Sequence, residues 1–227
     1  MKSLRITLIL TLLLISVAEA HQPRIVYDRN NNQENPIIIT QPEISRAYYG
    51  ELKGQEDNYM IIAREPFKLY LNILTPYNLN ENRKDFKVEV RDFENRKVLT
   101  LDGTQAEWTL YFEEFARDYY MKGPETSKEL KGGVYYMKVS NSNNQGKYSL
   151  AAGEKETFPL NEIFKTYYAI PRIKTEFFNQ PWYKVYINFV GIALAITLAI
   201  IITILLLLKK IFGKKKKAKI PPKRLTH

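Results

Sequence analysis

The sequence of 227 residues contains no cysteine and only two histidines, and these shortages exclude several kinds of chemistry. Without cysteine there is no disulfide framework, no thiol nucleophile and no zinc site that needs sulfur ligands. His21 and His227 stand at the two ends of the chain expected after processing, so no histidine-based triad or metal cluster can form inside a fold. We therefore predict no catalytic residues, no metal site, no cofactor and no enzymatic activity.

Acidic residues are absent from the last 19 residues, which begin at Lys209 and hold nine basic residues. Residues 21–183, in contrast, hold 22 basic and 23 acidic residues, so nearly all of the net charge of +10 lies in the tail. A basic surface on the folded part is not implied, and we expect no nucleic-acid partner.

The first hydrophobic segment has the form of a secretory signal peptide. Lys2 and Arg5 precede an apolar run over residues 6–17, and Ala18-Glu19-Ala20 supplies small residues for cleavage after Ala20. Twelve residues rise only about 18 Å as a helix, which is too short for the hydrocarbon core of a bilayer. We expect residues 1–20 to be removed.

The second hydrophobic segment, residues 185–208, has no charge over 24 residues. A helix of that length would rise about 36 Å, which predicts a transmembrane helix. Trp182, Tyr183 and Tyr186 suit the headgroup zone at one end, and lysines follow at the other. The expected topology is single-pass in the cell membrane, with the N-terminal domain outside and the C-terminus in the cytoplasm.

The tail supports two interpretations. Its lysines could bind anionic lipid of the inner leaflet, at about 1 kcal/mol for each basic residue near the surface. Alternatively, they act only as a stop-transfer signal that fixes the topology. The candidate lipid-binding residues are Lys214, Lys215, Lys216 and Lys217.

Most of the segment between residues 37 and 152 carries strand signals. Residues 67–74 alternate strictly, so that the apolar side chains at odd positions share one face. Such short alternating strands predict an all-β fold, a jelly-roll-like antiparallel β-sandwich. Further strands are expected over residues 37–39, 46–52, 58–63, 86–92, 98–101, 134–140 and 147–152.

Two segments show helical spacing instead. An apolar stripe predicts a short helix between the fifth and sixth strands, ended by Gly123-Pro124. A second stripe predicts a helix that begins after Pro159 and ends at Pro171. The first stripe comprises Trp108, Tyr111, Phe112, Phe115 and Tyr119, and the second Leu160, Ile163, Phe164, Tyr167 and Tyr168.

Three stretches resemble bacterial pre-peptidase C-terminal (PPC-like) domains. Tyr49-Gly50-Glu51-Leu52-Lys53-Gly54, followed by Asp57-Asn58-Tyr59, resembles their opening strands. Residues 130–139 and 146–150 resemble their closing strands. The resemblance covers residues 45–153 and implies a jelly-roll-like sandwich that serves as a binding or spacer module; some relatives bind calcium, collagen or polysaccharide. This chain departs from the family pattern because it has no enzyme domain, a longer excursion over residues 104–130, and the predicted membrane anchor.

Aromatic residues on the excursion are the candidate ligand-binding residues, since exposed rings on loops can stack on sugars or peptide partners. The same rings would also suit packing on the sandwich core, and that alternative is favoured for Trp108. Glu114 and Asp118 could form a carboxylate pair on one helix face, although a solvated face explains them as well. Asp57 and Asp102 suit ordinary turn chemistry as well as a calcium site. The candidate ligand-binding residues are Trp108, Tyr111, Tyr119 and Tyr120.

Together these features predict a membrane-anchored extracytoplasmic binding or spacer module that recognises a protein or glycan partner at the cell envelope. The alternative is an accessory subunit of a membrane complex, docked through its transmembrane and juxtamembrane helices. The expected segments are a signal peptide (1–20), an N-terminal extension (21–44), the sandwich (45–153), a juxtamembrane helix and linker (154–184), the transmembrane helix (185–208) and a basic cytoplasmic tail (209–227).

Overall fold

The computed structural model describes residues 21–79, 83–114, 116–157, 159–187 and 189–217. The predicted signal peptide and the end of the tail, residues 218–227, lie outside the described residues. The strands are β1 (Gln22–Ile25), β2 (Ile37–Ile39), β3 (Arg46–Lys53), β4 (Asp57–Ala63), β5 (Phe67–Pro76), β6 (Lys87–Asp92), β7 (Lys97–Asp102), β8 (Thr109–Glu113), β9 (Asp118–Leu130), β10 (Gly133–Ser140) and β11 (Gln145–Ala152). The helices are the 3₁₀ turn η1 (Gly103–Gln105), α2 (Leu160–Arg172), the π-helix η2 (Ile173–Phe177), the 3₁₀ helix η3 (Trp182–Tyr186) and α3 (Phe189–Lys217).

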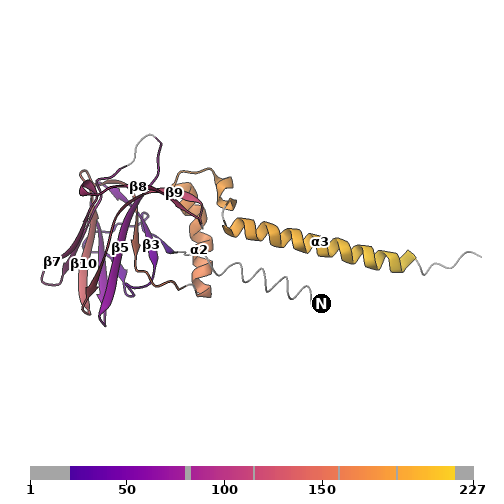
Figure 1. Ribbon diagram of the computed structural model, residues 1–227, viewed down its shortest axis with the longest axis horizontal. Coiled ribbons are helices and arrows are strands. Elements are labelled where there is room, and N and C mark those ends of the chain that lie inside the picture. Colours follow the sequence, from indigo (N-terminus) through magenta and orange to yellow (C-terminus); the bar gives the residue numbers. More distant parts are fainter. Residues whose placement is uncertain (1–20, 80–82, 115, 158, 188, 218–227) are drawn as a thin grey trace, which may run out of the picture.

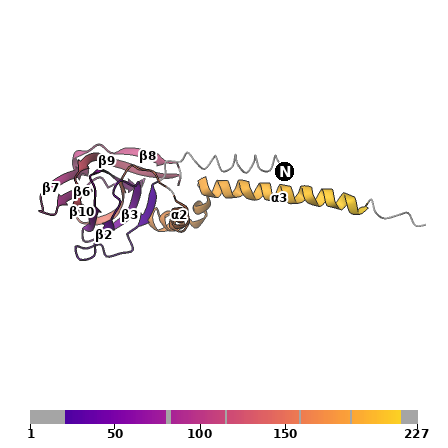
Figure 2. The same cartoon turned by 90° about the horizontal axis from the view of Figure 1, so that it is seen from below.

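The strands form two sheets packed face to face, which confirms the predicted β-sandwich (Figures 1 and 2). Sheet A has the order β1-β3-β11-β5-β9-β8, and sheet B has the order β2-β4-β10-β6-β7. The sandwich is not purely antiparallel, because β1 pairs parallel with β3 and β2 pairs parallel with β4. Both parallel strands come from the segment predicted as an extension, so that segment contributes an edge strand to each sheet.

The main core lies between the sheets and follows the predicted alternation. The odd-numbered side chains of β5 from Phe67 to Ile73 are at most 3% exposed, and Met137 and Val139 of β10 face them across the sandwich core. Burial of each such side chain contributes roughly 1.5–3 kcal/mol. Strand β3 passes so close to the Tyr148 ring that position 50 must be glycine, because a Cβ there would stand 2.3 Å from the ring.

The helix predicted over residues 108–119 is wrong, because this segment forms the hairpin of β8 and β9. The register pairs Tyr111 with Tyr120 and Phe112 with Tyr119, and Arg117 makes the turn with a φ of 59°. Two adjoining alternating strands thus produce the same spacing of aromatic residues as a helix. Phe115, which completed the stripe, lies outside the described residues.

The helix predicted after Pro159 is confirmed as α2, and Pro159 is its N-cap. Pro171 does not end it, since the chain continues into η2. The apolar stripe of α2 faces away from the sandwich. The residues of the helix that are buried against the sandwich are Glu162, Thr166 and Ile170. The exposed stripe comprises Leu160, Ile163, Phe164, Tyr167 and Tyr168.

The transmembrane helix predicted over residues 185–208 is wrong, since no helix within the described residues is long and apolar enough to cross a membrane. The uncharged run is not one helix: η3 ends at Tyr186, and Ile187 interrupts the helical backbone with φ −97° and ψ 59°. The helix that follows, α3, continues through the lysines of residues 209–217. The predicted single-pass membrane topology depended on this helix and is not supported.

Candidate functional site

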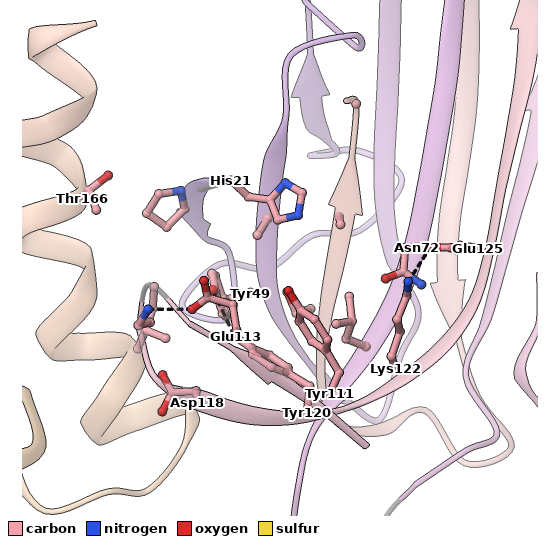
Figure 3. Close-up of a pocket in the computed structure, with 18 of the residues that line it drawn as sticks. His21, Tyr49, Asn72, Tyr111, Glu113, Asp118, Tyr120, Lys122, Glu125 and Thr166 are labelled. Atoms are coloured by element: carbon pink, nitrogen blue, oxygen red, sulfur yellow. Dashed lines mark hydrogen bonds and ion pairs between the residues drawn. The ribbon is translucent and has the colours of Figure 1, made fainter. Parts of the chain in front are cut away.

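A pocket of about 590 Å³ lies between the outer face of sheet A and the segment formed by α2 and η2 (Figure 3). Strand alternation explains its floor, because every second side chain of β3, β5, β9 and β11 points away from the main core and toward the helix. The floor combines aromatic and polar side chains with apolar ones from Ala47, Leu74 and Ala151. It includes Tyr49, Tyr70, Asn72, Tyr120 and Ser149.

The β8–β9 hairpin forms one wall and separates the predicted aromatic residues into two sets. Tyr111 and Tyr120 are paired in the ladder and line the pocket, with ring centroids 6.5 Å apart. Phe112 and Tyr119 form the next pair, with ring centroids 4.7 Å apart, and therefore lie on the opposite face of the sheet. Tyr119 packs there beside Tyr77.

Asn72 fixes the strand that crosses the floor. Its side-chain amide donates hydrogen bonds of 3.1 Å to the carbonyl oxygens of Gly123 and Pro124 in β9. The register between β5 and β9 shifts between Asn72 and Leu74. Such irregularities re-aim side chains and are common beside functional sites.

A buried ion pair connects the helical segment to the start of β9. Lys174 of η2 and Asp118 are 2% and 0% exposed in their side chains, and Nζ lies 2.7 Å from Oδ1. Lys174 also donates to the Ala116 carbonyl, and Gln180 donates to Asp118 Oδ1 at 2.9 Å. Burial raises the pKa of the Asp118 carboxyl, and the Lys174 ammonium opposes that rise. Short π-helical turns next to α-helices, such as η2, occur frequently at functional sites.

Two buried oxygens beside the pocket have no hydrogen-bond partner in the protein, Asp118 Oδ2 and Thr166 Oγ1. Both residues line the pocket, and Thr166 points into it from α2 (Figure 3). A buried oxygen without a partner costs about 1–3 kcal/mol.

The tyrosine hydroxyls at the pocket floor remain neutral donors and acceptors. Tyr49 Oη and Tyr120 Oη lie 3.2 Å apart. Burial raises the pKa of both phenols well above the usual value, and the nearby carboxylates Glu113 and Asp118 add to the rise. These hydroxyls therefore stay protonated at any physiological pH.

The structure brings together only two of the four aromatic residues predicted to bind a ligand. Tyr111 and Tyr120 line the pocket, whereas Tyr119 lies on the other face of the sheet. Trp108 is buried in the main core, where its Nε1 donates to the Gly103 carbonyl at 2.9 Å. Lys214, Lys215, Lys216 and Lys217 belong to the last turns of α3, but their side chains lie outside the described part, so lipid binding there stays a prediction.

The candidate calcium ligands have structural roles. Asp57 accepts hydrogen bonds from Tyr148 and Asn31 in the core, and Asp102 caps η1 through Thr104. Among the residues that the structure describes, no group of three or more histidine or acidic side chains is placed to hold a metal ion.

Sequence reasoning missed Tyr49, Asn72, Thr166 and Lys174. The sequence could have predicted Tyr70 and Asn72 as pocket residues, because they occupy the non-core face of the alternating strand β5. It could not have predicted Lys174, since a lysine in a linker of mixed composition is ordinary. Its burial becomes visible only when η2 packs on sheet A.

No family model matches the sequence, and no curated protein matches it. Among solved structures, the pre-peptidase C-terminal domain of a collagenase from Bacillus anthracis is similar, with 15% identity, a TM-score of 0.34, and coverage of 55% of this chain and 98% of that domain. A beta-glucosidase from Paenibacillus barengoltzii is similar over 59% of this chain but only 13% of its own length, with 10% identity and a TM-score of 0.30. The first is a domain of the class that the sequence motifs resemble. Both likenesses are of fold alone and carry no argument about what the chain binds.

Proposed function

We propose that this chain is a non-catalytic binding module of the cell envelope whose pocket accepts a sugar residue of a glycan. The observation that carries the proposal is the pocket between sheet A and α2, which Tyr49, Tyr111 and Tyr120 line together with polar side chains. The volume of about 590 Å³ falls in the range of small-ligand sites, which is roughly 300–1,000 Å³.

Sugar chemistry matches this lining. A sugar ring presents hydroxyl groups around its edge and an apolar face of C–H groups. The hydroxyls can form hydrogen bonds with polar side chains that line the pocket, such as Tyr70, Lys122 and Glu125. The apolar face can stack on Tyr111, a residue that is 41% exposed and lines the pocket.

Binding is better supported than hydrolysis. A pair of catalytic carboxylates requires one group free to donate or accept a proton. Asp118 is instead held by Lys174 and Gln180 through one oxygen. A flat protein partner is also less well supported, because protein interfaces bury about 800 Å² on each side, whereas this feature is concave.

A glycan microarray probed with the purified full chain tests the proposal. We expect binding to a restricted set of glycans, and we expect Tyr111→Ala to weaken it by about tenfold or more. Tyr119→Ala is the matched control, since it removes a half-exposed ring of the same hairpin on the opposite face, and it should leave binding unchanged. Binding that survives Tyr111→Ala but not Tyr119→Ala, or no glycan binding at all, would overturn the proposal.

A further inference from the structure

The helix α2 turns its apolar side outward, which reverses the usual arrangement of a surface helix. Such helices normally pack their apolar stripe on the core and expose their polar side chains. In α2, Glu162 and Thr166 are each 5% exposed against the sandwich, whereas Phe164 and Tyr168 are 67% and 73% exposed. Five of the seven exposed residues of this helix are large and apolar. A contiguous exposed apolar face of this kind marks an interaction surface.

The helix η3 extends this face. It lies beside α2 and exposes a tryptophan and two tyrosines. Between the two helices, η2 is mostly buried, and its one exposed residue, Glu176, is paired with Arg172 at 3.0 Å. The apolar helix α3 then leaves the body on the side of α2 that faces away from the sandwich (Figures 1 and 2). The outer apolar surface comprises Leu160, Ile163, Phe164, Tyr167, Tyr168, Trp182, Tyr183 and Tyr186.

The charge on the outer apolar surface is positive. The exposed charged residues of α2 and η3 are Lys165 and Lys184, and neither helix exposes a carboxylate. Glu162 is buried and is held by two cations, each at 2.8 Å, so it does not neutralise both. Along the chain, residues 177–217 contain seven lysines and no acidic residue. The surface therefore complements a partner with negative charge.

These features fit a lipid surface better than a protein. Tyrosine and tryptophan rings suit the boundary between headgroups and acyl chains, because each has an apolar body and a polar tip. Amphipathic helices lie in that boundary with their apolar face toward the acyl chains, and lysines are attracted to anionic headgroups. A second copy of the chain is less well supported, since a two-fold interface would bring the same positive patches together, and protein interfaces are poor in lysine.

We propose that the outer apolar surface lies on the surface of a bilayer that contains anionic lipid, with α2 parallel to the membrane plane. The rings of α2 and η3 enter the headgroup region, and the sandwich remains in water. The contact is interfacial, so it differs from the membrane-crossing helix predicted from the sequence. It is also independent of glycan binding, because the pocket lies on the opposite side of α2.

Tryptophan fluorescence of the full chain tests this contact without altering the surface. The chain has two tryptophans, of which Trp182 is 72% exposed and Trp108 is 7% exposed. The probes are vesicles of phosphatidylcholine with phosphatidylglycerol, with and without bromine on the acyl chains. We expect the emission of Trp182 to shift to the blue and to be lost to bromine quenching. The variant Trp182→Phe reports Trp108 alone, and its emission should not change.

A second reporter examines α2 itself, whatever else holds the chain on the vesicle. In the Trp182→Phe background, the ring introduced by Phe164→Trp should be quenched by the brominated vesicles. Phe93→Trp is the matched control, because Phe93 is 70% exposed in the turn between β6 and β7 of sheet B, and its ring should keep its emission. Vesicles of phosphatidylcholine alone, or high salt, should weaken binding about tenfold or more.

Four results would overturn the proposal. The first is the absence of binding to the anionic vesicles, and the second is binding without quenching of the ring introduced by Phe164→Trp. Equal quenching of the rings introduced by Phe164→Trp and Phe93→Trp would show that the contact is not specific to α2. A blue shift of Trp182 that grows with protein concentration in the absence of vesicles would assign the surface to a second copy. Equal binding to vesicles with and without phosphatidylglycerol would overturn the assignment to an anionic surface.

Discussion

Lys174 is the residue on which the attachment of the helical segment to the sandwich depends. Its ammonium group and the Asp118 carboxylate are almost completely buried and lie 2.7 Å apart. Removal of one partner from a buried ion pair leaves an uncompensated charge, which costs about 3–5 kcal/mol. We therefore expect Lys174→Met to lower the free energy of unfolding by about that amount in chemical denaturation.

Lys68→Met is the matched control for this change. Lys68 pairs with Glu154 at 2.6 Å, but both side chains are about half exposed. Water screens such a surface pair, so its loss should leave the unfolding midpoint essentially unchanged. Equal effects of the two lysine substitutions would show that the Lys174–Asp118 pair does not stabilise the fold as assigned.

Asp57 is a second buried acid, and it predicts a pH dependence of stability. Its oxygens accept from Tyr148 at 2.6 Å and from Asn31 at 3.2 Å, and burial raises its pKa above the usual value. The unfolded chain therefore loses this proton at a lower pH than the folded chain does. The contribution of Asp57 to stability is full at low pH and is lost as pH rises through the folded pKa.

Denaturation of the wild type and of Asp57→Asn from about pH 4 to pH 7 measures this contribution. The free energy of unfolding of the wild type minus that of the variant should fall as pH rises. A difference that grows with pH would show instead that the folded protein favours the charged carboxylate.

At the scale of elements, the helical segment after β11 has two unlike faces. Phe177 of η2 is 1% exposed and packs on Tyr49 with ring centroids 5.1 Å apart, whereas Phe164 of α2 is 67% exposed. Phe177→Ala should cost about 3–5 kcal/mol of unfolding free energy, since it opens a cavity above the sheet. Phe164→Ala should change stability by no more than about 0.5 kcal/mol.

Thermal and chemical denaturation of these two variants compares the same substitution on neighbouring elements. We expect Phe177→Ala to lose more stability than Phe164→Ala. The order of these two losses would be reversed if the exposed stripe of α2 were packed against the sandwich in solution. Glycan binding should also weaken in Phe177→Ala, because η2 carries Lys174 and closes one side of the pocket.

The sequence predicted the elements whose pattern arises within one strand. β5 and β10 alternate clearly, and their buried faces agree with the structure. β9 could not be predicted in this way, because it is largely polar and contains Gly123-Pro124. It is a strand because it pairs with β5 along most of its length, so tertiary pairing overrides local preference.

The orientation of α2 was also beyond sequence reasoning. An apolar stripe predicts a helix, but the face that becomes buried depends on what the helix meets. Here Glu162 meets Arg24 of β1 at 2.8 Å, and this contact helps turn the polar face of α2 toward sheet A. The break at Ile187 likewise follows from backbone geometry that an uncharged run does not reveal.

On the scale of the whole molecule, the pocket exists only because distant segments assemble. Its lining runs from His21 to Lys174 and draws on β3, β5, β8, β9, β11, α2 and η2. Sequence patterns identified Tyr111 and Tyr120 as candidates, but could not separate them from Tyr119 and Trp108. That separation depends on the β8–β9 register and on which face of sheet A remains outside the main core.

We expect the glycan to bind in the pocket between sheet A and α2. The most direct test is an NMR titration of the ¹⁵N-labelled full chain with the glycan that binds most tightly on the array, with amide shift changes mapped onto the fold. The changes should concentrate in β5, β8, β9 and the α2–η2 segment, and sheet B should be unaffected. Changes concentrated on sheet B or on the exposed stripe of α2 would contradict this expectation.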